Sequence, residues 1–193
     1  MNSTDSPLRQ MLLLDRDGTL NVEVDYLANS EELELLPGAV ESIRRAHELG
    51  WVVAVVTNQS GLVHGYFDQE DLDSVHSRLK KLIEDGGEKL DGIYVCPHSP
   101  TDGCECRKPK PGLLIQAAEE LHGDLSKSVM VGDKTADLSA GLAAGTHAVL
   151  VRTGYGRDTE REGNHGAEAV INDLRGLPAL LERWNAERFE TRD

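Results

Sequence analysis

Short apolar runs recur along the chain, and each is bounded by glycine, proline or polar residues. Three leucines at 12–14 run into an acidic turn, and WVVAVV at 51–56 runs into Thr57 and Asn58. Apolar runs of this length, rich in β-branched residues, are typical of buried strands. The pattern predicts strands at residues 12–14, 51–56, 92–96, 128–131, 147–151 and 168–171.

Between these runs the apolar residues take on helical spacing. After Asp68, a residue type that favours the N-cap of a helix, apolar side chains stand at 72, 75, 79, 82 and 83, and Gly86 follows. Pro37 and Gly38 open another such segment, at the place where proline is favoured. The pattern predicts helices at residues 37–47, 68–85, 111–122, 134–145 and 174–187.

Strands that alternate with helices predict an α/β fold with a doubly wound parallel sheet and right-handed crossovers. Each interval of the chain is occupied by a helix, a strand or a short loop, so we expect no large cap domain. We expect residues 11–187 to form a single domain, preceded by a disordered leader at 1–10 and followed by a tail at 188–193.

Composition narrows the classes of partner. The 193 residues carry a formal net charge of −14, which opposes binding to nucleic acid or to anionic lipid, and only 4% are aromatic. No apolar run approaches the ~20 residues of a membrane span. The first ten residues lack the apolar segment of a secretory signal. We therefore expect a cytoplasmic, monomeric protein whose partner is a small molecule.

The carboxyl ends of parallel strands lie along one edge of a sheet, so polar groups placed there can converge. By strand alternation, Asp15 and Asp17 are expected to face one way and Arg16 the other. An isolated Asp-x-Asp fits an acidic turn as well as an active site. Four strand ends or adjoining loops, however, carry polar groups: Asp15 and Asp17, Thr57 and Asn58, Arg107 and Lys108, Asp133 and Asp137.

The segments DRDGT, TNQSG, RKPKPG and GDKTAD resemble, in this order, the four motifs of the haloacid dehalogenase (HAD) superfamily of phosphatases. The resemblance covers roughly residues 11–153. It implies a Rossmann-like fold and phosphomonoester hydrolysis through an aspartyl phosphate, with Asp15 as nucleophile and Asp17 as general acid and base. It further implies a catalytic Mg²⁺ ion bound by the Asp15 carboxylate, the Asp17 backbone carbonyl and Asp133.

The residues themselves suit this chemistry. A carboxylate attacks phosphorus only if its repulsion with the phosphate is cancelled, and a lysine with a hard cation supplies that cancellation. The resemblance implies that Thr57 and Lys108 bind the transferring phosphoryl group and that Asp137 supports the residues around the metal. Phosphate-monoester hydrolysis needs up to ~10²¹-fold acceleration, whereas one general acid gives only ~10²–10⁴. We therefore expect charge stabilisation to matter as much as proton transfer.

A second candidate site lies in a loop that holds all three cysteines of the chain. Cys96, His98, Cys104 and Cys106 place three thiols and an imidazole within eleven residues. Such a set predicts a closed, structural Zn²⁺ site, and the resemblance implies the same. The alternatives are free thiols beside a chance histidine, or a Cys104–Cys106 disulfide. A zinc ion here would order the loop and fix the two basic residues that follow it.

The wider segment CPHSPTDGCECRKPKPG resembles one branch of the superfamily, the heptose-bisphosphate and histidinol-phosphate phosphatases. NVEVDYL and TNQSGLVHGYF are more similar to the heptose enzymes, so we expect removal of the 7-phosphate of a heptose 1,7-bisphosphate. Histidinol phosphate is the alternative substrate, and a zinc-binding interaction module without activity is the alternative class. Arg107, Lys110 and Lys134 offer positive charge for a second phosphate. The resemblance implies substrate contacts from Arg16, Glu23, Val24, Asp25, Tyr26, Asn58, Gln59, Ser60, Arg107 and Lys134.

Overall fold

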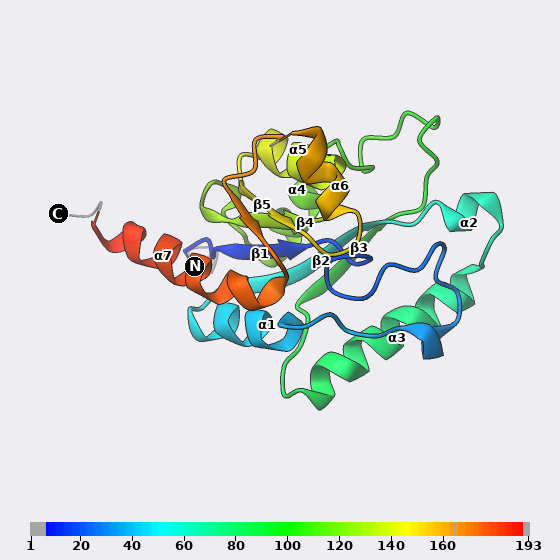
Figure 1. The fold of residues 1–193 in the computed structure, drawn as a ribbon, viewed down its shortest axis with the longest axis horizontal. Helices are drawn as coiled ribbons and strands as arrows, with labels where there is room; N and C mark the ends of the chain where they lie inside the picture. Colours follow the sequence, from blue (N-terminus) through cyan, green and yellow to red (C-terminus); the bar gives the residue numbers. More distant parts are fainter. Residues whose placement is uncertain (1–6, 164, 191–193) are drawn as a thin grey trace, which may run out of the picture.

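The computed structural model describes residues 7–163 and 165–190, which form an α/β fold around one six-stranded sheet (Figure 1). Every pair of neighbouring strands is parallel, and the strand order is β3-β2-β1-β4-β5-β6. The predicted doubly wound parallel sheet is therefore confirmed. The strands are β1 (Met11–Leu14), β2 (Val52–Asn58), β3 (Gly92–Cys96), β4 (Val129–Gly132), β5 (His147–Val151) and β6 (Ala169–Ile171).

All five predicted helices are present, and two short helices are additional. The helices are α1 (Ala39–Glu48), α2 (Gly61–His64), α3 (Gln69–Asp85), α4 (Gly112–Leu121), α5 (Thr135–Ala144), α6 (Gly156–Glu162) and α7 (Leu177–Glu190). Short 3₁₀ turns lie at Ser30–Glu32, Leu125–Lys127 and Leu174–Gly176. Helices α2 and α6 escaped prediction because α2 has only four residues and α6, GRDTERE, contains no apolar side chain to show a period.

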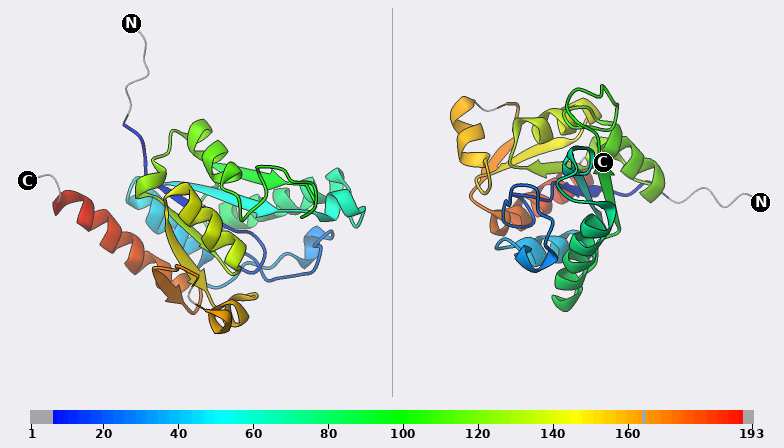
Figure 2. Two further views of the ribbon diagram at one scale, coloured as in Figure 1. Left: turned by 90° about the horizontal axis from the view of Figure 1, so that it is seen from above. Right: turned by 90° about the vertical axis from the view of Figure 1, so that its right-hand side faces the viewer.

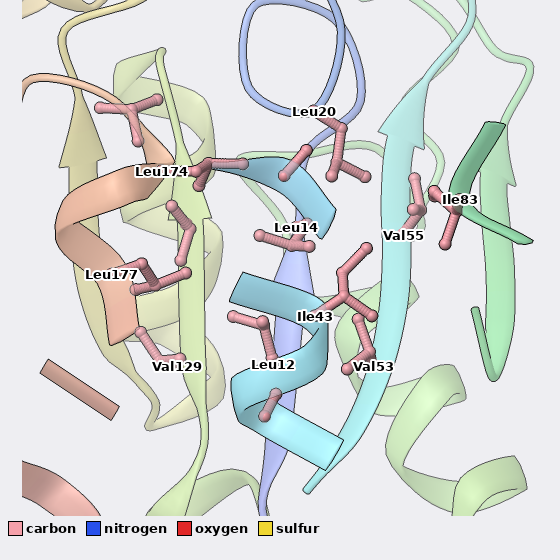
Figure 3. Packing of buried hydrophobic residues seen from close by; sticks show 14 of the residues in the cluster. Leu12, Leu14, Leu20, Ile43, Val53, Val55, Ile83, Val129, Leu174 and Leu177 are labelled. Atoms are coloured by element: carbon pink, nitrogen blue, oxygen red, sulfur yellow. The ribbon is translucent and has the colours of Figure 1, made fainter. Parts of the chain in front are cut away.

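Successive residues of each strand point to opposite faces of the sheet, which gives two apolar layers. Leu12 and Leu14 of β1 pack on the face covered by α1, α3 and α7, in one buried cluster with Ile43, Ile83 and Leu177 (Figure 3). Met11 and Leu13 belong to the opposite layer, which α4 and α5 cover. Figure 2 shows these two groups of helices on opposite sides of the sheet. Burial on both faces explains why the strands read as continuous apolar runs.

The strand order reverses direction between β1 and β4, and this determines where a ligand can bind. From β1 the chain proceeds outward to β2 and β3, then returns to the other side of β1 at β4 and continues outward to β6. In open α/β sheets, the crevice at such a switch point, beyond the carboxyl ends of the strands, receives the ligand. Within the described residues no large cap domain covers this crevice.

The structure differs from the expected boundaries at both ends of the domain. Residues 1–6 and 191–193 of the expected leader and tail lie outside the described residues. Arg9, placed in the leader, pairs with the segment after α4: its N–H donates to the His122 carbonyl at 3.0 Å, and its carbonyl accepts from Asp124 N–H at 2.8 Å. Helix α7 continues to Glu190, three residues beyond its predicted end. No helix of the described chain is long and apolar enough to cross a membrane.

Candidate active site

A cavity of about 380 Å³ opens at the switch point, at the carboxyl ends of β1 and β2. Asp15 follows β1 directly and is held by its backbone N–H, which donates to the Val131 carbonyl of the neighbouring strand at 2.9 Å. Four residues that line the cavity, Leu27, Gly61, Ala136 and Tyr155, were not named from the sequence. The lining residues named from the sequence are Asp15, Asp17, Glu23, Val24, Asp25, Tyr26, Thr57, Asn58, Gln59, Ser60, Arg107, Lys108, Lys134 and Asp137.

Lys108 links the nucleophile candidate to a second buried carboxylate. Its Nζ lies 2.6 Å from Asp15 Oδ1, 2.6 Å from Asp137 Oδ1 and 2.7 Å from the Val56 carbonyl oxygen. Burial opposes the charge of this ammonium, yet Asp137 and Asp15 outweigh burial and raise the pKa of Lys108. Burial, followed by repulsion from Asp137, raises the pKa of Asp15 to about 6. One lysine therefore does not fully compensate the two carboxylates.

Asp133 adds a third buried carboxylate and an unsatisfied oxygen. Its Oδ2 accepts from Tyr155 N–H at 2.8 Å, whereas its buried Oδ1 has no hydrogen-bond partner. Burial, with repulsion from Asp15 and Asp137, raises the pKa of Asp133 to about 8. One carboxylate oxygen from each of these three residues lies within 4.8 Å of the others. An orphaned buried oxygen among uncompensated carboxylates fits a hard divalent cation such as Mg²⁺.

Two glycines allow Asp133 to lie this close to the first loop. Gly18 has a φ of +79°, and a Cβ atom there would lie 2.4 Å from Asp133 Oδ2. A Cβ atom on Gly154 would lie 2.2 Å from the same oxygen. Neither position can carry a side chain without moving the carboxylate. The glycine of the DRDGT segment therefore has a steric role in addition to forming the turn.

Asp17 is held by donors from three directions. Its carboxylate accepts hydrogen bonds from Arg16 Nη2 at 2.8 Å, Gln59 Nε2 at 2.8 Å and Asn21 Nδ2 at 3.0 Å. Burial favours the protonated form, but the charge of Arg16 and these hydrogen bonds prevail and lower the pKa of Asp17. The carboxyl is thus ionised in the free protein and is suited to accept a proton.

Arg16 faces away from the cavity, as expected, but it lacks the expected access to a substrate. Its residue is fully buried, it does not line the cavity, and its guanidinium turns back to bind the carboxylate of its neighbour Asp17. Asp15 and Asp17 line the cavity and Arg16 does not, as strand alternation predicted, although β1 itself ends at Leu14. Its side chain is placed to hold Asp17 and not to contact a substrate.

The second and third motifs fasten Lys108 to the sheet. The Asn58 side chain pairs with the Lys108 backbone in both directions: its Nδ2 donates to the carbonyl at 3.0 Å, and its Oδ1 accepts from the N–H at 3.1 Å. Gln59 Nε2 donates to the Thr57 hydroxyl at 2.8 Å as well as to Asp17. Thr57 is buried and lines the cavity. The TNQSG segment therefore positions the lysine and the first motif together.

Two cations stand at the wall of the cavity, and a third expected one points elsewhere. Arg107 donates to the His98 carbonyl at 2.9 Å. Lys134 pairs with Glu23 at 2.9 Å, and its Nζ lies 4.7 Å from the centre of the Tyr155 ring. Lys110 instead donates to the Gly103 carbonyl and pairs with Glu105, so its expected contribution to the anion site is not supported.

The cysteine loop brings its four predicted ligands together. The three sulfurs lie 3.3, 3.5 and 3.7 Å apart, and His98 Nδ1 lies 3.2 Å from Cys106 Sγ. All three cysteines are free, which argues against the alternative of a Cys104–Cys106 disulfide. Sulfurs bound to one tetrahedral zinc ion at about 2.3 Å stand roughly 3.8 Å apart. The cluster therefore has nearly the dimensions of a closed zinc site.

Comparison with known proteins decides the family. The D-glycero-β-D-manno-heptose-1,7-bisphosphate 7-phosphatase of Pseudomonas putida is 41% identical over 173 residues, covering 89% of this chain and 99% of that protein. The chain belongs to the HAD-like heptose-bisphosphate phosphatase family. A HAD-hydrolase-like family model also matches residues 105–177 of this phosphatase.

Solved structures of the same family have a similar fold. A D,D-heptose 1,7-bisphosphate phosphatase from B. bronchiseptica, complexed with magnesium and phosphate, superposes with a TM-score of 0.84 at 37% identity, covering 90% of this chain and 98% of that one. The corresponding enzyme from Burkholderia thailandensis gives a TM-score of 0.70 at 30% identity, covering 90% and 99%. The recognition of a HAD-type phosphatase from its four motifs is confirmed.

Several residues of this phosphatase site were not predicted from its sequence. Tyr155 lines the cavity, donates its N–H to Asp133 and places its ring beneath Lys134. Asn21 donates to Asp17, and His76 contacts Arg16 across sixty positions of sequence. Tyr155 follows a predicted strand end, as the other site residues do, and could have been found there. No periodicity or motif points to the contact of His76.

Proposed function

We propose that this phosphatase removes the 7-phosphate of D-glycero-β-D-manno-heptose 1,7-bisphosphate, with Mg²⁺ as cofactor. The central observation is the group formed by Asp15, Lys108 and Asp133: a nucleophile candidate, a buried ammonium 2.6 Å from it and a neighbouring carboxylate with an unpaired oxygen. The names of the relatives supply the substrate. The cations Arg107 and Lys134 on the cavity wall suit the phosphate that remains on the sugar.

In the first step, a carboxylate oxygen of Asp15 forms a bond to the phosphorus of the ester. The P–O bond to the sugar breaks, its electron pair stays on the sugar oxygen, and that oxygen takes the proton of Asp17. A phosphate dianion beside Asp17 favours the protonated form of this carboxyl by like-charge repulsion. Lys108 reduces the repulsion between Asp15 and the phosphate, which is the main electrostatic obstacle to attack.

In the second step, Asp17 acts as a base. It takes a proton from a water molecule whose oxygen attacks the phosphorus of the aspartyl phosphate. The bond between phosphorus and the Asp15 oxygen breaks, which restores the carboxylate and releases inorganic phosphate. Arg16, Asn21 and Gln59 favour the ionised form of Asp17 that this step needs.

The chain offers Mg²⁺ the carboxylates of Asp15 and Asp133 and the backbone carbonyl of Asp17. When bound, the ion supplies positive charge next to the phosphoryl oxygens and offsets the surplus of carboxylates. Asp137 binds Lys108 and, through its Oδ2, accepts the Lys134 backbone N–H at 2.9 Å. Its place is to hold Lys108 and the start of α5.

We also assign a structural Zn²⁺ ion to Cys96, His98, Cys104 and Cys106. Four protein ligands leave no open position for substrate, so the ion serves the geometry of the loop. Few contacts separate the proposed zinc site from the active site. The carbonyl of the ligand His98 accepts from Arg107, which lines the cavity and precedes Lys108.

Phosphate release from heptose 1,7-bisphosphate tests the function. We expect Mg²⁺-dependent turnover by the native protein, a higher kcat/KM than on histidinol phosphate, and a loss of at least ~10³-fold in Asp15→Asn, since the nucleophile is removed. Asp158→Asn, an exposed carboxylate paired with Arg161, is the matched control and should retain activity. Undiminished turnover in Asp15→Asn would refute the assignment of Asp15 as nucleophile. A preference for histidinol phosphate would refute the assignment of the heptose substrate.

A further inference from the structure

Beside Asp17 lies a buried cation, Arg16, which forms and breaks no bond in the steps above. The Arg16 residue is fully buried, although a guanidinium cannot lose its proton in a protein. A buried charge is stable only if it is paired and its donors are satisfied. Arg16 meets this demand with two partners, Asp17 and His76.

The contacts of Arg16 divide its guanidinium into two parts. Nε and Nη2 form a fork on the Asp17 carboxylate, at 3.0, 3.1 and 2.8 Å. Nη1 points the other way and lies 3.1 Å from His76 Nε2. The fork fixes the plane of the carboxylate, because two parallel N–H donors constrain orientation as well as distance.

His76 can act only as the acceptor of this bond. A guanidinium has donors and no acceptor, so Nε2 of His76 must carry the lone pair and its proton must be on Nδ1. Burial and the nearby charge of Arg16 lower the pKa of His76 to about 4, which agrees with a neutral ring. His76 belongs to α3, one residue after the buried Val75, and its side chain is partly buried.

We propose that His76 is a positioning residue for the proton donor: it holds Arg16, and through Arg16 it sets the orientation of the Asp17 carboxylate toward the leaving oxygen of the ester. This inference rests on the proposed phosphatase mechanism. Without the ring nitrogen, one N–H of a buried guanidinium is left unpaired, which is costly. The guanidinium then shifts toward another acceptor and carries the fork on Asp17 with it.

The dependence of the rate on the leaving group separates positioning from general damage. A sugar alkoxide is a strong base and needs the proton of Asp17, whereas p-nitrophenolate leaves without one. The ratio kcat/KM covers the steps up to departure of the leaving group and is insensitive to later hydrolysis of the aspartyl phosphate. Comparing kcat/KM on heptose 1,7-bisphosphate and on p-nitrophenyl phosphate therefore isolates proton donation to the leaving oxygen.

His76→Phe keeps a ring and removes the acceptor, and His76→Gln restores an acceptor. We expect His76→Phe to lose about 10-fold in kcat/KM on the heptose substrate and less than about twofold on p-nitrophenyl phosphate, since misplacement costs part of a general-acid effect. His76→Gln should recover most of the loss. Ser77→Phe, on the exposed side of the same helix, is the matched control and should match the native protein on both substrates.

An equal loss on both substrates, no loss on either, or a failure of His76→Gln to recover would overturn the inference. His76→Leu replaces His76→Phe if the phenylalanine variant does not fold, as judged by thermal unfolding. Turnover of the heptose substrate by the native protein tests the proposed function separately. If that turnover is absent, the same ratio is measured on an alkyl phosphate that the native protein does hydrolyse.

Discussion

At the scale of single residues, Asp133 lies very close to Gly18, the glycine of the DRDGT segment. Gly18→Ala would place a methyl group 2.4 Å from Asp133 Oδ2, so the carboxylate must move. We expect the Mg²⁺ concentration for half-maximal activity to rise by roughly 10- to 100-fold, as for other changes that displace a metal ligand. A magnesium titration of phosphate release measures this.

Gly50→Ala provides a matched control for that substitution. Its φ of +80° is almost the same as the +79° of Gly18, but nothing lies within 4 Å of the Cβ it would gain. Both variants therefore carry the same backbone cost of about 1–2 kcal/mol, and only Gly18→Ala should alter the response to Mg²⁺. Equal magnesium titrations for the two variants would show that the close contact at Asp133 does not matter.

The sequence indicated which residues reach the cavity, but not the contacts of those buried beside it. Asp15, Thr57 and Lys108 could be placed at the cavity because parallel strand ends converge and their motifs stand in a fixed order. Arg16 was given a substrate contact because a sequence does not show whether a guanidinium turns inward. The partner that decides its direction, His76, comes from a distant helix.

At the scale of elements, the cysteine loop has few apolar side chains of its own between residues 97 and 106. Cys104→Ser removes one of the four proposed ligands, and we expect the purified protein to lose its zinc. Because Arg107 and Lys108 follow the loop, kcat/KM should fall by about 10- to 100-fold, the usual cost of disturbing support around a site. Metal analysis and phosphate release on the same samples measure both effects.

Pro100→Ala is the appropriate comparison, since Pro100 is exposed in the same loop and belongs to no ligand set. It should keep both zinc and activity. Full activity in a zinc-free Cys104→Ser protein would separate the loop metal from the positioning of Lys108.

Element prediction depended on the presence of apolar side chains. The six strands and five longer helices each contribute buried or partly buried apolar side chains to the core, so they were visible in the sequence as apolar runs or as helical spacing. Helix α6 has none, yet Thr159 within it donates its hydroxyl to the Asp133 carbonyl at 2.8 Å. A helix held by polar contacts to the active-site loop cannot be detected from hydrophobic spacing.

At the scale of the whole molecule, the three clustered carboxylates make stability depend on pH and metal together. The pKa of Asp133 is about 8 in the folded protein, against 3.8 for an ordinary aspartate, so the folded state binds more protons than the unfolded state between these values. Asp15, at about 6, acts in the same direction. Without Mg²⁺, the contribution of these two carboxyl groups to the free energy of unfolding is therefore greatest below pH 4 and is lost as the pH rises toward 8.

Bound Mg²⁺ should reverse that loss, because it favours the ionised carboxylates. For protein dialysed free of magnesium, we expect added Mg²⁺ to raise Tm by roughly 5 °C more at pH 8 than at pH 5.5. Thermal unfolding at the two pH values, with and without the ion, measures this. The same series on Asp133→Asn should show a much smaller difference, and an unchanged difference in that variant would exclude Asp133 as its source.

The parallel, doubly wound architecture was predictable because strands and helices alternate, whereas the order of the strands was not. Strand order depends on the direction in which each crossover leaves the sheet, and local sequence does not specify it. That order places β4 next to β1 and so brings Asp133 to Asp15. From the sequence, this proximity of Asp133 to Asp15 follows only from the resemblance to known motifs.

The arrangement around Lys108 has a consequence for the order of events during turnover. Its Nζ, which has three N–H donors, already lies 2.6–2.7 Å from three oxygens, those of Asp15, Asp137 and Val56. A phosphoryl oxygen can therefore gain a proton donor from Lys108 only when one of these oxygens gives one up. The contact with Asp15 is the one that weakens, since the Asp15 carboxylate loses its negative charge when it becomes an acyl phosphate. The freed N–H of Lys108 can then donate to a negatively charged oxygen of the phosphoryl group. Nucleophile and electrophile would thus share one donor in sequence, with no rearrangement of the surrounding backbone.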